Sequence, residues 1–243
     1  ADFQWIADWS AGPAFVPSGT ALNGVVEAGP CVRTMQEDYD DDVAYQAYRK
    51  IYDLARSDNK KPFFGVVSFT SPHTPFNVSQ RYWDLYNHND IDLPAVPEVP
   101  FAELDYLSKA LFFAHGRHRH SVTNNHRLNA RHAYYAMISY LDEKLGQLLE
   151  QLEETGLRDN TVVVFTSDHG EMMGERGMWF KQCFWEWSAR VPLVISDRRT
   201  TQATRIQSNC SLVDLLPTFV ALAGGGNGLL APTISEMAGH SLV

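Results

Sequence analysis

A short run of β-branched residues that ends abruptly in polar side chains is the feature that most constrains the fold. Residues 161–166 (Thr-Val-Val-Val-Phe-Thr) predict a buried strand, and Asp168 and His169 follow it almost at once. Apolar strands of this kind are typical of sheets covered by helices on both faces. Because α/β folds place their ligands at the ends of such strands, the run predicts an α/β protein with its chemistry around these two residues.

The pair Asp168 and His169 has the donor atoms of a metal site. A carboxylate oxygen and an imidazole nitrogen at one strand end suit a divalent cation, although two side chains cannot complete a coordination sphere. Lys181 lies beyond a loop that contains three glycines and could bring a positive charge back toward the pair. The alternatives are a helix-capping aspartate beside a hydrogen-bonded histidine, and a solvated loop lysine.

A second apolar run also ends in a polar turn. Residues 63–70 (Phe-Phe-Gly-Val-Val-Ser-Phe-Thr) predict another buried strand, followed by the turn Ser71-Pro-His-Thr-Pro75. The two prolines stiffen the backbone around His73. His73 is therefore either a surface loop histidine or a site residue, and both interpretations stay open at this point.

Helices and one further strand are predicted around these runs. A helix over about 43–55 follows the acidic stretch 38–42, which we interpret as a solvated first turn rather than a metal site. The leucine periodicity over 129–154, closed by Gly156, predicts a long core helix. Residues 191–195 predict a third strand, and residues 214–224 predict a short helix capped by Asp214.

One histidine-rich turn does not have the composition of a zinc site. His115, His118 and His120 are interleaved with two arginines and have no cysteine beside them. Because the arginines would repel a cation, we do not predict a metal there.

Composition limits the classes of partner. The chain of 243 residues is 44% hydrophobic, which is enough for the core of one large domain or two small ones. A formal charge of −9 disfavours nucleic acid but tolerates an anionic substrate held by local cations. No apolar run approaches the roughly 20 residues that span a bilayer, so no membrane association is predicted. Three cysteines without a C-x-x-C pair favour a reducing, cytoplasmic location.

Several motifs together resemble those of a known family. They are Val67-Ser-Phe-Thr-Ser-Pro-His73, Phe165-Thr-Ser-Asp-His-Gly170, Gly174-Glu-Arg-Gly-Met-Trp-Phe-Lys181 and Ser188-Ala-Arg-Val-Pro-Leu193. In order and content the chain looks like a sulfatase of the alkaline phosphatase superfamily, and most closely like the choline sulfatases. The resemblance implies an alkaline-phosphatase-like α/β fold with a mixed, mainly parallel β-sheet flanked by helices. Residues 1–243 would form the central part of the catalytic domain, an internal fragment incomplete at both ends.

The resemblance also implies roles for individual residues. Asp168 and His169 match two ligands of a divalent metal, calcium in the first instance and manganese as the alternative. His73 and Lys181 match the residues that hold the sulfate oxygens and assist the leaving group. Trp5 matches an aromatic residue that faces the trimethylammonium of choline, with burial in the core as the alternative. The implied reaction is hydrolysis of choline O-sulfate to choline and sulfate.

The family's nucleophile motif is not found in this sequence. Family members carry a Cys (or Ser)-x-Pro-x-Arg motif whose cysteine becomes formylglycine, whereas Cys31-Val-Arg-Thr34 lacks the proline. We expect formylglycine upstream of Ala1, no hydrolysis by the fragment alone, and a homo-oligomer for the full-length protein. A phosphonate monoester hydrolase or phosphodiesterase of the same superfamily, and an inactive truncated product, are the alternatives.

Overall fold

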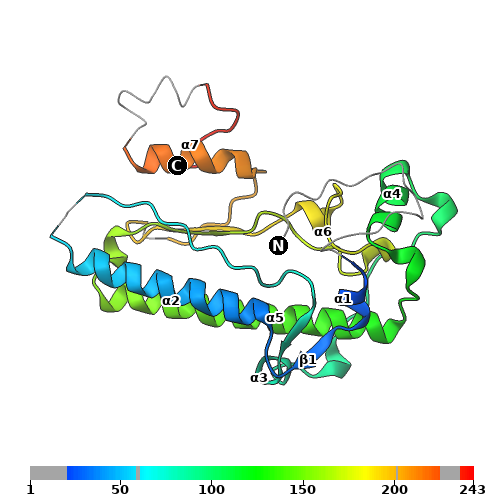
Figure 1. The fold of residues 1–243 in the computed structure, drawn as a ribbon. Helices are drawn as coiled ribbons and strands as arrows, with labels where there is room; N and C mark the ends of the chain where they lie inside the picture. The colour runs from blue at the N-terminus through cyan, green and yellow to red at the C-terminus, as the bar shows by residue number, and fades with distance from the viewer. Residues whose placement is uncertain (1–20, 59–60, 201, 225–235) are drawn as a thin grey trace.

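The computed structural model describes residues 21–58, 61–200, 202–224 and 236–243. Two long helices, α2 (Met35–Arg56) and α5 (Asn124–Glu154), lie against each other on one side of the strands β3 (Val163–Thr166) and β4 (Leu193–Ser196). Helix α7 (Leu215–Leu222) lies on the other side (Figure 1). Strands covered by helices on both sides are the arrangement expected of an α/β protein.

The strands form two small sheets of opposite sense. β1 (Gly29–Cys31) runs parallel to β2 (Asn77–Ser79), whereas β3 runs antiparallel to β4 with Val163 opposite Ser196. The shorter helical elements are α1 (Asn23–Val26), α3 (Gln80–Trp83), α4 (Tyr106–Ala114), α6 (Glu186–Ala189) and the 3₁₀ turns at His88–Asp90, Phe101–Glu103, Arg117–Arg119, Arg158–Asn160, Glu175–Gly177 and Leu212–Asp214. No helix in the described part of the chain is both long enough and apolar enough to cross a membrane.

The long helix predicted over 129–154 is confirmed as α5. Its C-terminus is closed by Gly156, which has a φ of +69°. The Leu157 amide donates to the Leu152 carbonyl at 3.0 Å, and the Gly156 amide donates to the last turn in the same way. This is a Schellman motif, in which the glycine takes a left-handed conformation that other residues adopt only at a cost.

The core lies where the first half of α5 meets three other segments. Small side chains on one face of α5 allow β2 and the residues after β3 to approach closely. The buried cluster includes Leu22, Val25, Phe76, Val78, Tyr82, Ala130, Ala133, Ala136, Met137, Tyr140, Trp179 and Phe180. Because Trp179 and Phe180 are both almost fully buried, the loop that precedes Lys181 is anchored in the main core rather than in solvent.

Helix α2 begins earlier than the sequence predicted, and its acidic residues have a different role. Thr34 caps it, accepting the Glu37 amide at 3.0 Å while the Glu37 carboxylate accepts the Thr34 amide at 2.8 Å. The prediction of a solvated acidic first turn is wrong for Asp40, which is fully buried, and for Asp41, which contacts Lys144 at 2.5 Å. The reason is the earlier start, since it moves these acids into the second turn, where one face of the helix meets the protein.

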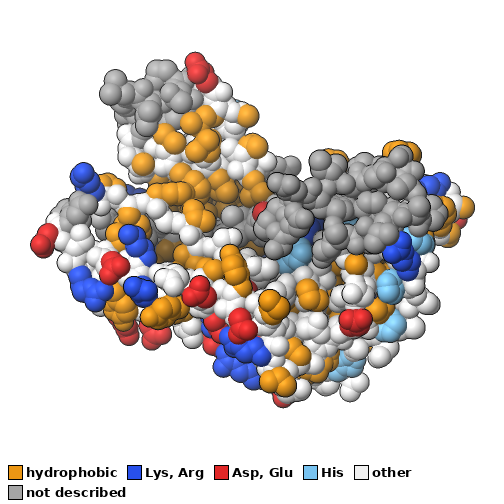
Figure 2. Space-filling view, in the orientation of Figure 1, with side chains coloured by type: hydrophobic (Ala, Val, Ile, Leu, Met, Phe, Trp, Pro, Cys, Tyr) orange, Lys and Arg blue, Asp and Glu red, His pale blue; other side chains and the backbone are white. Residues whose placement is uncertain are grey.

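The predicted strand over 63–70 is not formed in the described structure. Phe64 and Val66 are 70% and 76% exposed, and no strand is present at 61–70. A strand exists only through pairing with a neighbour, and here β3 and β4 pair with each other. Figure 2 shows hydrophobic side chains gathered on the face below α7, the side on which Phe64 contacts Phe219.

The prediction of a buried strand over 161–166 is half right, since β3 forms but Phe165 is 41% exposed.

Two shorter predicted elements are confirmed. The strand predicted over 191–195 is β4, and the helix predicted over 214–224 is α7. Asp214 occupies the N-cap position of α7, but its side chain makes no capping hydrogen bond to that helix. It accepts the Ser211 amide at 2.7 Å instead, in the capping box of the 3₁₀ turn that leads into α7.

The histidine-rich turn after α4 contributes a buried residue. His115 is 1% exposed, and its Nε2 donates to Oε1 of Gln182 at 2.8 Å. Burial lowers the pKa of His115 to about 4, although the bond to Gln182 opposes the shift. This histidine is therefore a neutral core residue.

We predict that His115 makes stability depend on pH. Its ordinary pKa is 6.5, so between pH 6.5 and 4 the unfolded chain binds more protons than the folded one. The free energy of unfolding is then highest above pH 6.5 and falls as the pH drops, by at most about 1.4 kcal/mol per pH unit from this group. In urea unfolding measured between pH 6.5 and 4, the free energy of unfolding of His115→Gln should fall less steeply with pH than that of the unsubstituted protein. The exposed His240→Gln is the control, and equal slopes in all three proteins would contradict the prediction.

Candidate active site

Three loops bring four of the five sequence-predicted residues together. His73 lies in the turn of residues 70–74 (the His73 turn), Asp168 and His169 follow β3, and Lys181 lies in the loop of residues 180–182 (the lysine loop). The rings of His73 and His169 are 6.4 Å apart between centroids. Trp5 lies outside the described residues.

His73 and Lys181 are in direct contact. Nδ1 of His73 donates to the Thr74 carbonyl at 2.8 Å, because a carbonyl can only accept. Nε2 of the neutral ring therefore carries the lone pair, and Nζ of Lys181 donates to it. Burial, and then the charge of Lys181, lower the pKa of His73, so the neutral ring is favoured.

The lysine loop is held on both sides of Lys181. The Phe180 amide donates to the Glu171 carboxylate, and the Gln182 side chain accepts from His115. Phe180 and Gln182 both have positive φ, +65° and +71°, a conformation that non-glycine residues keep only where contacts hold them. Burial lowers the pKa of Lys181, and the nearby Glu171 and Asp168 oppose that shift.

Asp168 and His169 present two donor atoms to the same space. Nδ1 of His169 donates to the Gly170 carbonyl at 2.8 Å, so Nε2 keeps its lone pair. That Nε2 lies 3.6 Å from Oδ2 of Asp168. Two ligands bound to one cation at about 2.1 and 2.4 Å lie about 3.2–3.7 Å apart. The pair therefore fits a divalent cation, and the Asp168 side chain, 84% exposed, leaves the site open on one side.

Within the described ranges, no third His, Cys, Asp or Glu joins this pair in a group that could hold a metal. The roles of Asp168 and His169 as metal ligands, and of His73 and Lys181 in catalysis, stay predictions.

The backbone after His169 tolerates only glycine. The Gly170 amide donates to the Ser188 carbonyl at 2.7 Å, and a Cβ at position 170 would lie 2.0 Å from the Trp187 carbonyl oxygen. This close approach fixes the Asp168-His169 pair against helix α6, which contains Trp187 and Ser188.

A hollow beside the site contains residues that the sequence did not single out. It is lined by His169, Lys181, Gln182, Cys183, Phe184, Ser188 and Ala189. Phe184 is 93% exposed within it. Glu171, His115 and Gln182, which anchor the lysine loop, were also missed. No periodicity or motif marks either the Glu171–Phe180 contact or the contact of His115 with Gln182, which is distant in sequence.

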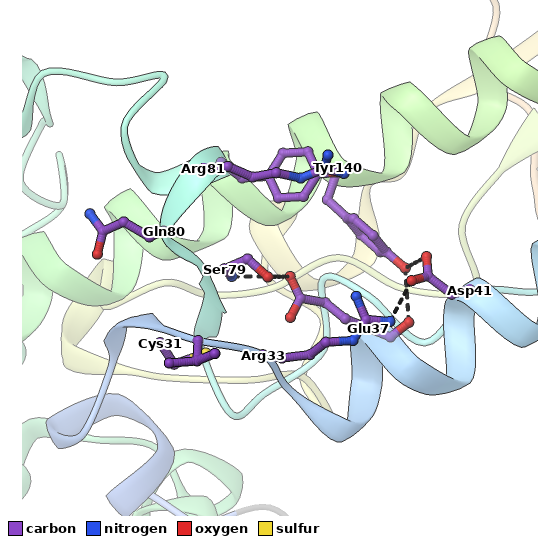
Figure 3. A pocket seen from close by; sticks show the side chains of 10 residues that line it. Cys31, Arg33, Glu37, Asp41, Ser79, Gln80, Arg81 and Tyr140 are labelled. Carbon is purple, nitrogen blue, oxygen red and sulfur yellow. Dashed lines mark hydrogen bonds and ion pairs between the residues drawn. The ribbon is translucent and has the colours of Figure 1, made fainter.

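A second hollow lies between α2, α5 and β2 and is less suited to catalysis (Figure 3). Its charged groups neutralise one another, since Arg33 and Lys144 both contact Asp41 at 2.5 Å. Tyr140 donates to the same carboxylate at 2.9 Å. These groups form a structural ion-pair network with no free charge directed at a ligand.

Comparison with known proteins shows the family to which the chain is similar. The family model described as "Sulfatase" matches residues 2–225. A choline-sulfatase from Rhizobium meliloti (strain 1021) is 39% identical over 228 residues, covering 92% of this chain and 44% of the relative. A multifunctional alkaline phosphatase superfamily protein, PehA, from Trinickia caryophylli is 33% identical over 179 residues, covering 68% of this chain and 35% of the relative.

A solved structure agrees with the fold. The phosphonate monoester hydrolase of Agrobacterium radiobacter superimposes with a TM-score of 0.64 and 28% identity, covering 82% of this chain and 41% of that one. The chain thus spans less than half the length of the relatives it matches. Since the family model covers nearly all of the chain and the predicted alkaline-phosphatase-like fold is confirmed, this chain belongs to the sulfatase family.

Proposed function

We propose that the full-length protein is a sulfuric ester hydrolase that converts choline O-sulfate to choline and sulfate. The observation that carries this proposal is the contact of Lys181 with a neutral His73 beside two side chains that fit a cation. A sulfate monoester needs positive charge at its non-bridging oxygens and assistance at its leaving oxygen. These four residues supply both in one place.

In this proposal each described residue has a separate task. The ammonium of Lys181 binds a sulfate oxygen, and its lowered pKa makes it a better proton donor to the leaving alcohol. Nε2 of His73 orients Lys181 and exchanges a proton with it. Asp168 and His169 hold the divalent cation, calcium or else manganese, with other ligands from outside the described residues.

Two further groups are part of the proposal. The bound cation would polarise the ester and favour the nucleophile. That nucleophile, formylglycine, would come from a part of the full-length protein other than residues 1–243. Trp5 would face the quaternary ammonium of choline, a cation that attracts an indole ring but cannot donate hydrogen bonds.

The choice of ester rests on the relative named a choline-sulfatase and on the formal charge of −9, which tolerates a cationic substrate. A phosphonate monoester hydrolase is the second candidate, favoured by the structural neighbour of that name. Ligands at a strand end do not by themselves distinguish sulfur from phosphorus.

We expect the full-length protein to prefer choline sulfate. Its kcat/KM should exceed that for 3,3-dimethylbutyl sulfate, the neutral isostere, by about tenfold, because a cation–π contact contributes roughly 1–2 kcal/mol. Steady-state assays with these two esters, 4-nitrophenyl sulfate and a phosphonate monoester measure the preference. Equal rates for choline sulfate and its isostere would reject the choline assignment, and faster phosphonate hydrolysis would favour the second candidate.

We expect Asp168→Asn in the full-length protein to lose metal and turnover together. Replacing a charged oxygen ligand by an amide should reduce bound metal and lower kcat by about 10²-fold or more. Elemental analysis of the purified variant measures the metal directly. Asp159→Asn is the matched control, because that side chain is also 84% exposed but lies before β3. Unchanged metal content with full activity would refute the ligand assignment.

A further inference from the structure

Helix α2 holds the first half of the His73 turn through Asp40. Oδ1 of Asp40 accepts the Thr70 amide at 2.6 Å, and Oδ2 accepts the Ser71 amide at 2.9 Å. The His73 amide donates to the Thr70 carbonyl at 3.0 Å and so closes the turn. Both oxygens of one carboxylate are thus used on consecutive amides just before His73.

The same helix face holds the second half of the turn. Gln36 lies four residues before Asp40, one helical turn away, so both side chains project on the same side of α2. Nε2 of Gln36 donates to the His73 carbonyl at 2.9 Å and to the Thr74 carbonyl at 3.1 Å. Acceptors from Asp40 and donors from Gln36 therefore bracket His73.

Burial of the Asp40 carboxylate is destabilising unless these hydrogen bonds offset it. Asp40 is 0% exposed, and among the described residues none forms an ion pair with it. A buried carboxylate without a cation is destabilising by several kcal/mol unless hydrogen bonds replace its water. Two amides of the His73 turn supply those bonds, so the position of the carboxylate and that of the turn determine each other.

We infer that Asp40 and Gln36 are positioning residues that fix His73 against Lys181. Among the described residues, their hydrogen bonds go to the backbone of the His73 turn, and none joins them to Lys181 or to the Asp168-His169 pair. The inference rests on the proposed function in one respect, namely that His73 orients Lys181, which donates the proton to the leaving alcohol. Displacement of a positioned group by about 1 Å costs on the order of 10²-fold in rate.

The test uses Asp40→Asn in the full-length protein. The amide keeps the size of the side chain but accepts only one of the two turn amides and directs an N–H at the other. We expect kcat on choline sulfate to fall by about 10²-fold with KM within about threefold, because general acid assistance is lost while binding is kept. On 4-nitrophenyl sulfate, whose leaving group needs little assistance, the loss should stay below about tenfold.

Three further variants make this result specific. Asp42→Asn, an exposed acid on the same helix, should leave both rates unchanged. In the double variant, Asp40→Asn should lower kcat less than about threefold below that of His73→Ala alone. The effects of substituting residues that act through one group are not additive. Gln36→Met, at a half-buried position, repeats the test if Asp40→Asn does not fold. Equal losses on both esters, or full additivity with His73→Ala, would overturn the inference.

A readout without turnover separates this inference from the proposed function. The ¹⁵N shifts of the His73 ring can be assigned by comparison with His73→Ala. They should show the Nδ1–H tautomer in the unsubstituted protein and a mixture of tautomers in Asp40→Asn. If the unsubstituted protein hydrolyses no sulfate ester, the proposed function fails while the shifts still decide the positioning. Identical ring shifts in Asp40→Asn and the unsubstituted protein would reject it.

Discussion

The contact between Nζ of Lys181 and Nε2 of His73 is the interaction on which the candidate site depends. It joins a turn before β2 to a loop after β3, which are separated by more than a hundred residues. Burial lowers the pKa of both His73 and Lys181. Nε2 of His73 carries the lone pair that faces Lys181 because Nδ1 donates to the Thr74 carbonyl. A change in either loop would break this geometry.

The anchors of both loops are buried or half-buried polar groups. Asp40 and Gln36 hold the His73 turn from α2, while Glu171 and His115 hold the lysine loop. Polar groups in a protein interior are costly unless they are paired, so each is a specific tie rather than general packing. Trp179 and Phe180 add apolar burial, which fastens the lysine loop to the α5 core. The catalytic side chains thus sit on loops, and helices and core fix the loops.

Apolar side chains of residues 63–70 are exposed in the described part of the chain. The chain spans less than half the length of its relatives, and the apolar residues of 63–70 find no strand partner among the described residues. The described strands form one parallel pair and one antiparallel pair, and the alkaline-phosphatase-like fold is supported by the structural neighbour.

Sequence by itself determined the elements whose signal is local. The leucine period gave α5, the β-branched run gave β3, and the polar residues at the ends of apolar runs indicated Asp168, His169 and His73 as site candidates. Only the tertiary structure decided that Asp40 is a buried tie instead of a solvated helix cap, that 63–70 pairs with no described strand, and that Gln182 and His115 hold the lysine loop. A helical face or a turn is set by neighbouring residues, but burial and pairing depend on segments distant in sequence, and no local pattern records which of them will meet.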